Sequence, residues 1–167
     1  MDRANELVLH GAAAHEFVSA FFGLVDASSG HMAYSMAGHP PPVLLRSGSE
    51  PVLLQADGAV LGAGGGRRYE NHGTVLDIGD LLVLYTDGLT EARSPAGIAF
   101  GTERLLSAIA EVGHESAERV PESLFLSAFG HAEGRLRDDV AIVALRRTEP
   151  TGGFDQGRLQ LEAAAVA

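Results

Sequence analysis

The chain has 167 residues, 46% of them hydrophobic, which fits one globular domain with a single core. The chain has twenty-two acidic and twelve basic residues and a formal net charge of −10. A phosphate backbone would be repelled, so we expect no nucleic-acid binding. The lack of cysteine excludes disulfides, thiolate zinc sites and cysteine nucleophiles, so any metal must have oxygen or imidazole ligands. No apolar run reaches the roughly 18 residues of a membrane helix, and the N-terminus does not resemble a signal peptide. We therefore expect a cytoplasmic protein that does not bind membranes.

The first half of the chain predicts a short helix followed by two hairpins. Residues 1–10 have the apolar spacing of a short amphipathic helix. Turn residues at 26–30 separate two apolar segments, and the three prolines at 40–42 end the second of them because proline offers no N–H donor. The expected strand pairs are 16–26 with 31–37, and 43–45 with 52–54.

The second half predicts a central strand and two helices. The apolar run Leu81 to Tyr85 has the length of a strand that is buried on both faces, so we expect it in the middle of a sheet. The other expected elements are a glycine-rich loop at 57–68, a strand at 69–77, helices around 105–112 and 120–129, a last strand at 140–145, and a flexible tail at 148–167 with a weakly helical pattern from Leu159 to Ala165.

Acidic residues stand at the ends of two strongly apolar strands. Asp87 follows the strand at 81–85, whereas Asp138 and Asp139 precede the strand at 140–145. If these strands are antiparallel neighbours, the acidic residues share one edge of the sheet. Carboxylates gathered there suit Mg²⁺ or Mn²⁺. The simpler interpretation, which spacing alone favours, is that Asp87 caps a helix or turn while Asp138 and Asp139 only begin a strand.

Other polar residues have mainly structural explanations. His39 lies between a glycine and three prolines and is expected to fix a turn rather than to bind a ligand. The glycines at 62–66 open no helix, which fits a surface loop better than a phosphate cradle. Asp26 and Asp80 lie in glycine-containing turns and are interpreted as structural. Glu91 follows the Asp-Gly pair at 87–88 by three residues, which is consistent with a short helix after Asp87, and it is interpreted as a residue that caps that helix or supports the site.

Taken together, the motifs resemble a known family, the metal-dependent protein serine/threonine phosphatases (PPM, type 2C-like), in the branch of stage II sporulation protein E. The resemblance covers residues 1–147 and implies that they are the C-terminal part of such a phosphatase domain. It implies an α+β fold, an α-β-β-α sandwich of antiparallel sheets flanked by helices, without its N-terminal part. The motifs that carry it are Ala-Gly-His-Pro-Pro at 37–41, Leu-Tyr-Thr-Asp-Gly-Leu-Thr-Glu-Ala at 84–92, Phe-Gly at 100–101 and Asp-Asp at 138–139.

The resemblance also implies a metal site at a sheet edge. It assigns metal ligation to Asp87 and Asp138, with Asp139 as a further ligand or a support, and two Mn²⁺ or Mg²⁺ ions in the complete domain. A metal-activated water is then the nucleophile, so no side chain is assigned as catalytic. The family's first acidic motif, a Gly-Gly-Asp, lies before the start of this chain, so half of the metal ligands are expected to be absent. Met36 and Ala141 replace the usual Asn and Thr.

The implied function is hydrolysis of phosphoserine or phosphothreonine in a regulatory protein. The implied partner is a phosphorylated protein such as an anti-sigma-factor antagonist of a bacterial partner-switching circuit, and a homodimer of the chain remains open. Two alternatives also remain open. The chain could be a truncated or degenerate copy that binds a protein without turnover, or a fragment of a longer enzyme, and an acidic motif encoded upstream of Met1 would favour the fragment.

Overall fold

The computed structural model describes residues 1–11, 17–26, 28–55, 57–64, 68–149 and the backbone of 161–166. Contacts divide the chain into two compact units, where length alone predicts one. The first unit comprises Met1–Pro41 and Gln55–Leu76, and the second comprises Pro42–Leu54 and Asp77–Ala167. Since the chain passes between the units three times, neither is a continuous segment.

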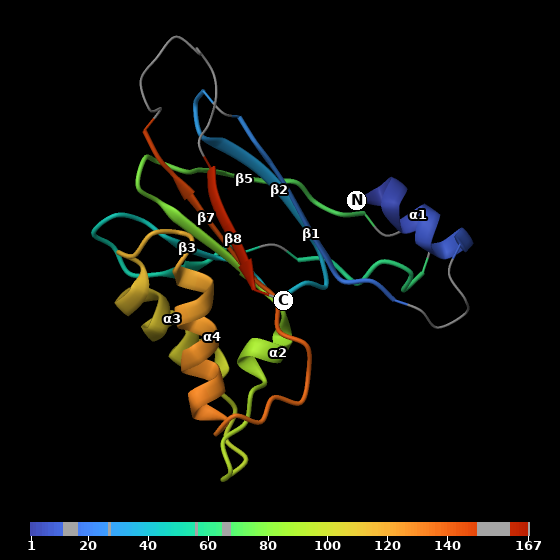
Figure 1. The fold of residues 1–167 in the computed structure, drawn as a ribbon. Helices are drawn as coiled ribbons and strands as arrows, with labels where there is room; N and C mark the ends of the chain where they lie inside the picture. Colours follow the sequence, from blue (N-terminus) through green and yellow to red (C-terminus); the bar gives the residue numbers. More distant parts are fainter. Residues whose placement is uncertain (12–16, 27, 56, 65–67, 150–160, 167) are drawn as a thin grey trace. The chain divides into compact units, whose positions relative to one another are not determined.

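The first unit contains a three-stranded antiparallel sheet in the order β1-β2-β5, together with helix α1 (Figure 1). The predicted first hairpin is confirmed as β1 paired with β2. Asn5 of α1 is buried, and its side chain accepts a bond from the Gly62 amide at 2.9 Å, which ties the helix to the glycine-rich loop. The elements of this unit are α1 (Asp2–Gly11), β1 (Ala20–Val25), β2 (His31–Ala37) and β5 (His72–Val75).

The turn of the first hairpin is organised by Asp26, as predicted. Its carboxylate accepts hydrogen bonds from the Ser28 hydroxyl at 2.7 Å and from the amides of Ser28 and Ser29 at 2.8 and 3.0 Å. These bonds stabilise the charged form, led by that from the Ser28 side chain, and they lower the pKa of Asp26 from 3.8 to about 2. Gly30 then takes a positive φ of 78°, which favours glycine at the end of the turn.

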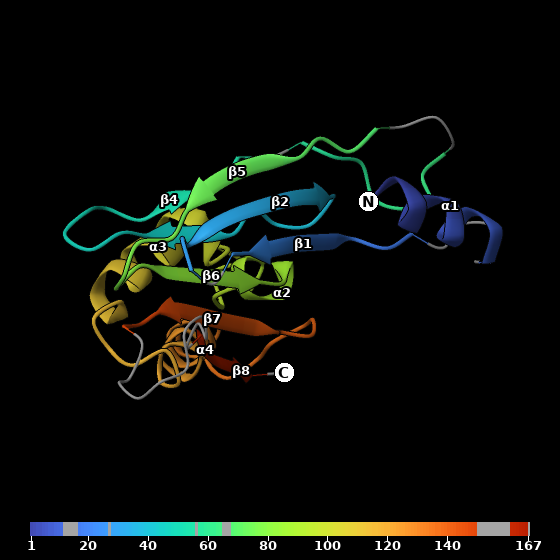
Figure 2. The ribbon, with the colours of Figure 1, turned by 90° about the horizontal axis from the view of Figure 1, so that it is seen from above.

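The second unit contains a five-stranded antiparallel sheet in the order β4-β3-β6-β7-β8 (Figure 2). The apolar run at 81–85 forms β6 in the middle of this sheet, so the prediction of a central strand is confirmed. The elements are β3 (Val43–Leu45), β4 (Val52–Leu53), β6 (Leu81–Tyr85), α2 (Asp87–Thr90), α3 (Gly101–Val112), α4 (Val120–His131), β7 (Ile142–Arg147) and β8 (Leu161–Val166).

The core of the second unit lies between this sheet and helices α3 and α4 (Figure 1). Alternate residues of β6 point to one face, as the two-residue period of a strand requires. Leu82 on the opposite face is also buried, which confirms the expectation of burial on both faces. The buried cluster includes Leu81, Val83 and Tyr85 of β6, Leu105 and Ile109 of α3, and Val120 and Leu124 of α4.

The weakly helical pattern predicted from Leu159 to Ala165 is wrong for Leu161–Val166, which form strand β8. Residues Leu161–Val166 pair antiparallel with β7, with Ile142 opposite Val166. The ladder of hydrogen bonds along the edge of β7 outweighs the weak helical preference of alanine, because tertiary pairing overrides local propensity. Residues 150–160 lie outside the described residues, and the assignment of 148–167 to a flexible tail stays a prediction.

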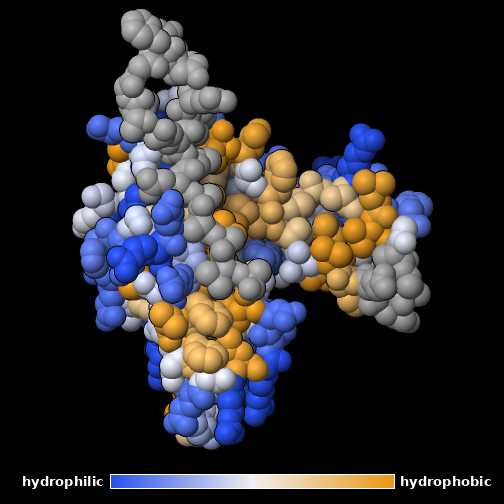
Figure 3. Space-filling view, in the orientation of Figure 1, coloured by the Kyte–Doolittle hydropathy of each residue, from blue (hydrophilic) through white to orange (hydrophobic). Residues whose placement is uncertain are grey.

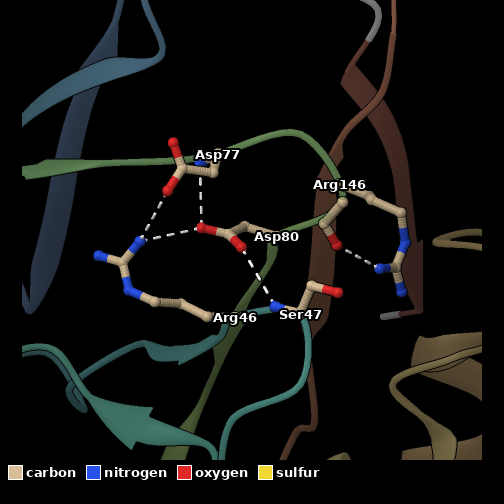
Figure 4. Close-up of polar contacts among 6 residues, drawn as sticks. Arg46, Ser47, Asp77, Asp80 and Arg146 are labelled. Atoms are coloured by element: carbon tan, nitrogen blue, oxygen red, sulfur yellow. Dashed lines mark hydrogen bonds and ion pairs between the residues drawn. The ribbon is translucent and has the colours of Figure 1, made fainter.

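The start of β6 is held by a buried carboxylate (Figure 4). The Asp80 side chain is 3% exposed and accepts bonds from Arg46 Nη1 at 3.1 Å and from the Asp77 amide at 3.0 Å. A cavity of about 340 Å³ adjoins this end of the sheet, lined in part by Arg46, His114 and Arg146. This network confirms the structural interpretation of Asp80.

Apolar side chains also reach the surface of the second unit, around α4 (Figure 3). Leu126 and Phe129 are 57% and 38% exposed. In the part of the chain that the structure describes, the longest helices have 12 residues, and none has the length and apolar character needed to cross a bilayer.

Candidate functional site

The predicted acidic edge is formed where β6 ends and the segment before β7 begins. The two strands are antiparallel, and their last register pair is Tyr85 with Ile142. Beyond that pair the Thr86 amide donates to the Ala141 carbonyl at 3.0 Å, so the chains stay side by side. The C-terminal end of β6 therefore lies next to the N-terminal end of β7, as the opposite polarity of the two acidic motifs predicts.

The Thr86 side chain adds two further bonds across this edge. Its hydroxyl donates to the Asp139 carbonyl at 3.1 Å and accepts from the Ala141 amide at 2.9 Å. These bonds connect residues 53 and 55 positions apart in the sequence. They fix the backbone of the Asp-Asp segment against the residue that precedes Asp87.

Gly88 allows the same two segments to approach closely on the other side of Asp87. A Cβ atom at Gly88 would lie 2.4 Å from the Asp139 carbonyl oxygen and 3.1 Å from the carbonyl carbon. Side chains cannot occupy that space, because real Cβ atoms essentially never come within 3.0 Å of backbone atoms. The glycine of the Asp-Gly pair is thus required by packing against Asp139.

The three acidic side chains at this edge are exposed. The short helix expected after Asp87 is confirmed as α2, of which Asp87 is the first residue. Asp138 Oδ1 accepts a bond from the Asp139 amide at 2.8 Å, which fixes the turn into β7. Glu91 ends α2 through its amide, which donates to the Asp87 carbonyl at 2.8 Å. This bond uses only the backbone, so the capping or supporting role of the Glu91 side chain stays a prediction.

The described residues fit only part of a metal site. The edge brings together the backbones that carry Asp87, Asp138 and Asp139, and carboxylates are the donors that Mg²⁺ and Mn²⁺ prefer. Yet within the described ranges no group of three or more His, Asp or Glu side chains is placed to hold an ion. The assignment of these three residues as metal ligands therefore stays a prediction.

His39 and the acidic edge belong to different units of the chain. His39 follows β2 in the first unit and is half-buried, whereas the acidic edge belongs to the second unit. Sequence reasoning missed Thr86 as the residue whose hydroxyl bridges the two segments of this edge. Its only signal is its position, because a hydroxyl directly before the acidic residue at a strand end can reach the neighbouring strand.

The fold of helices and antiparallel sheets matches solved PP2C phosphatase structures. The structure of the PP2C phosphatase domain and a fragment of the regulatory domain of SpoIIE from Bacillus subtilis matches with a TM-score of 0.74 at 18% identity, over 85% of this chain and 41% of that chain. The structure of the RsbU and RsbW domains of Rv1364c from Mycobacterium tuberculosis also matches with a TM-score of 0.74. It is 26% identical, over 89% of this chain and 41% of that chain.

The sequence matches the stage II sporulation protein E (SpoIIE) family over residues 1–148, and the chain belongs to that family. Among curated relatives, the phosphoserine phosphatase RsbU of Bacillus subtilis is 28% identical over 144 residues, which is 86% of this chain and 43% of RsbU. The chain spans only 21% and 43% of the lengths of the first two curated relatives it matches. Its relatives are PP2C phosphatases, a class that depends on metal ions in general.

Proposed function

We propose that this chain contributes the Asp87 and Asp138–Asp139 edge to a metal-dependent phosphatase that hydrolyses phosphoserine or phosphothreonine in a regulatory protein. The observation that carries the proposal is the pairing of β6 with β7, which brings two separate acidic motifs to one sheet edge. Membership of the SpoIIE family supports the same reaction, because RsbU is a phosphoserine phosphatase.

The paired strands β6 and β7 would keep the acidic residues that follow and precede them at a fixed place on the sheet edge. Asp87, Asp138 and Asp139 would supply part of the ligand set for Mn²⁺ or Mg²⁺, and the remaining ligands would come from residues outside this edge. When bound, such ions supply an activated water and neutralise charge on the transferring phosphoryl group. No side-chain nucleophile is required, which is consistent with a sequence that has no cysteine.

The proposed substrate is a phosphorylated protein of a partner-switching circuit, such as an anti-sigma-factor antagonist. Support comes from the relatives. RsbU carries the phosphoserine activity in its name, and Rv1364c joins an RsbU domain to an RsbW domain in one protein. The three carboxylates lie at the surface and not in a closed pocket. An exposed edge of this kind suits a protein substrate better than a small molecule.

The test uses the complete gene product that contains these residues and a phosphoserine peptide. We expect hydrolysis only with Mn²⁺ or Mg²⁺, and a loss of about 100-fold or more in kcat for Asp87→Asn and for Asp138→Asn. Asp77→Asn is the matched control, since Asp77 is an exposed aspartate beyond the other end of β6, and its rate should stay at the wild-type value. Unchanged rates for both edge variants would overturn the proposal. A gene product that binds the phosphoprotein without hydrolysing it would favour the non-catalytic alternative.

A further inference from the structure

We infer that Thr86 is a positioning residue whose hydroxyl holds the Asp138–Asp139 segment in place beside Asp87; this inference rests on the proposed function. Thr86 is the N-cap residue of α2, with an extended backbone at φ −88° and ψ 158°. A threonine at that position ordinarily accepts a hydrogen bond from an amide in the first turn of its own helix. Here it makes no such capping bond.

The hydroxyl is instead directed to the neighbouring segment. It donates to the Asp139 carbonyl at 3.1 Å and accepts from the Ala141 amide at 2.9 Å. One side chain therefore satisfies a donor and an acceptor on both sides of Val140. Serine could make both bonds, whereas valine has the same shape and could make neither.

The Asp139 carbonyl is restrained from two directions. Thr86 donates a hydrogen bond to its oxygen, and the Cα of Gly88 packs so closely that a Cβ there would lie 2.4 Å from the same atom. Asp87 stands between these two residues in the sequence. The carbonyl is thus fixed by both neighbours of Asp87, so these two contacts hold the backbone of the Asp-Asp segment beside Asp87.

These contacts act on the proposed metal ligands through the backbone. Replacement of a residue that orients metal ligands without contacting the metal typically lowers metal affinity by about 10–100-fold. Loss of the hydroxyl also removes the part-buried hydrogen bond of the Ala141 amide, whereas the exposed Asp139 carbonyl can bond to water instead. A purely structural role would lower stability without moving the metal concentration at which the folded protein reaches half its activity.

The experiment compares Thr86→Val with Thr86→Ser in the complete gene product. The first readout is amide hydrogen exchange at Ala141, which should be at least about tenfold faster in Thr86→Val and near the wild-type rate in Thr86→Ser. The second is the half-saturating Mn²⁺ concentration, which should rise about tenfold or more in Thr86→Val and return toward wild type in Thr86→Ser.

Ser107→Ala is the matched control. The Ser107 hydroxyl donates to the Glu103 carbonyl at 3.0 Å within α3, so this variant removes a hydroxyl–carbonyl bond from the second unit but leaves the bonds to Asp139 and Ala141 intact. Its Ala141 exchange and its Mn²⁺ dependence should match the wild type. If Asp87→Asn abolishes turnover while Thr86→Val keeps the wild-type Mn²⁺ dependence, the positioning role is wrong and the proposed function stands. If Asp87→Asn is also without effect, the proposed function itself fails.

Discussion

Removal of the Asp80 carboxylate should destabilise the second unit far more than removal of its neighbour Asp77. Asp80→Ala takes away the acceptor for Arg46 Nη1, for the Asp77 amide at 3.0 Å and for the Ser47 amide at 3.4 Å (Figure 4). The Asp77 amide donates to a buried charge, and such a bond contributes about 1.5–3 kcal/mol. The Arg46 side chain is 39% exposed, so solvent screening reduces the ion pair to about 1 kcal/mol.

These contributions give a loss of about 3 kcal/mol in the free energy of unfolding for Asp80→Ala. Urea denaturation followed by circular dichroism should show it as a fall in the midpoint of about 1.5 M, for a slope of about 2 kcal/mol/M. Asp77→Ala removes a side chain that is 73% exposed and lies 3.6 Å from Arg46, so it should cost about 0.5 kcal/mol or less. Equal midpoint shifts for the two variants would refute the assignment of Asp80 as the residue that holds the start of β6.

Two further outcomes test the first unit. A carbon NMR titration of the Asp26 carboxyl should give a pKa of about 2, below the ordinary 3.8, because the Ser28 and Ser29 bonds stabilise the charged form. The folded-state pKa is the lower one, so this stabilisation is fully present above about pH 4 and is lost as the pH falls through 2; a midpoint near 3.8 would contradict it. Gly38→Ala should lower stability by about 2 kcal/mol or more, since its φ is +65° and a Cβ would lie 2.3 Å from a Val60 methyl. Gly48→Ala, with φ +73° and open space, is the control for backbone strain alone, and an equal loss in thermal denaturation would show that the Val60 contact has no effect.

The sequence predicts the central strand and shows what an antiparallel pairing would do, but it does not by itself establish which strand lies beside β6. A five-residue apolar run such as Leu81 to Tyr85 needs cover on both faces, so it belongs in the middle of a sheet. Asp87 follows one such strand and Asp138 precedes another, and antiparallel pairing is the arrangement that joins those ends. The first inference depends on local pattern alone, whereas the second also requires that the two strands be neighbours, which the structure shows.

The remaining features depend on contacts between distant residues, which local patterns do not encode. Arg46 reaches Asp80 across 34 positions, and the Thr86 hydroxyl reaches Asp139 across 53. The local pattern at Thr86 is that of a helix cap, and the structure uses its hydroxyl for a different bond. Strand β8 was missed for a related reason, because its alanines prefer helix slightly and the free edge of β7 decides the outcome.

The two aspartates that flank β6 show how burial and partners separate structural from functional carboxylates. Asp80 precedes the strand, is 3% exposed, and its oxygens accept bonds from a guanidinium and two amides. Asp87 follows the same strand, is exposed, and none of the described cations pairs with its side chain. A carboxylate whose oxygens already accept hydrogen bonds from the protein is a poor ligand for a metal ion. An exposed carboxylate on a rigid sheet edge can coordinate one. Strand β6 spans roughly 17 Å at about 3.4 Å per residue, so it separates Asp80 at its start from Asp87 beyond its end. The Arg46–Asp80 pair can therefore be altered without changing the site proposed at Asp87.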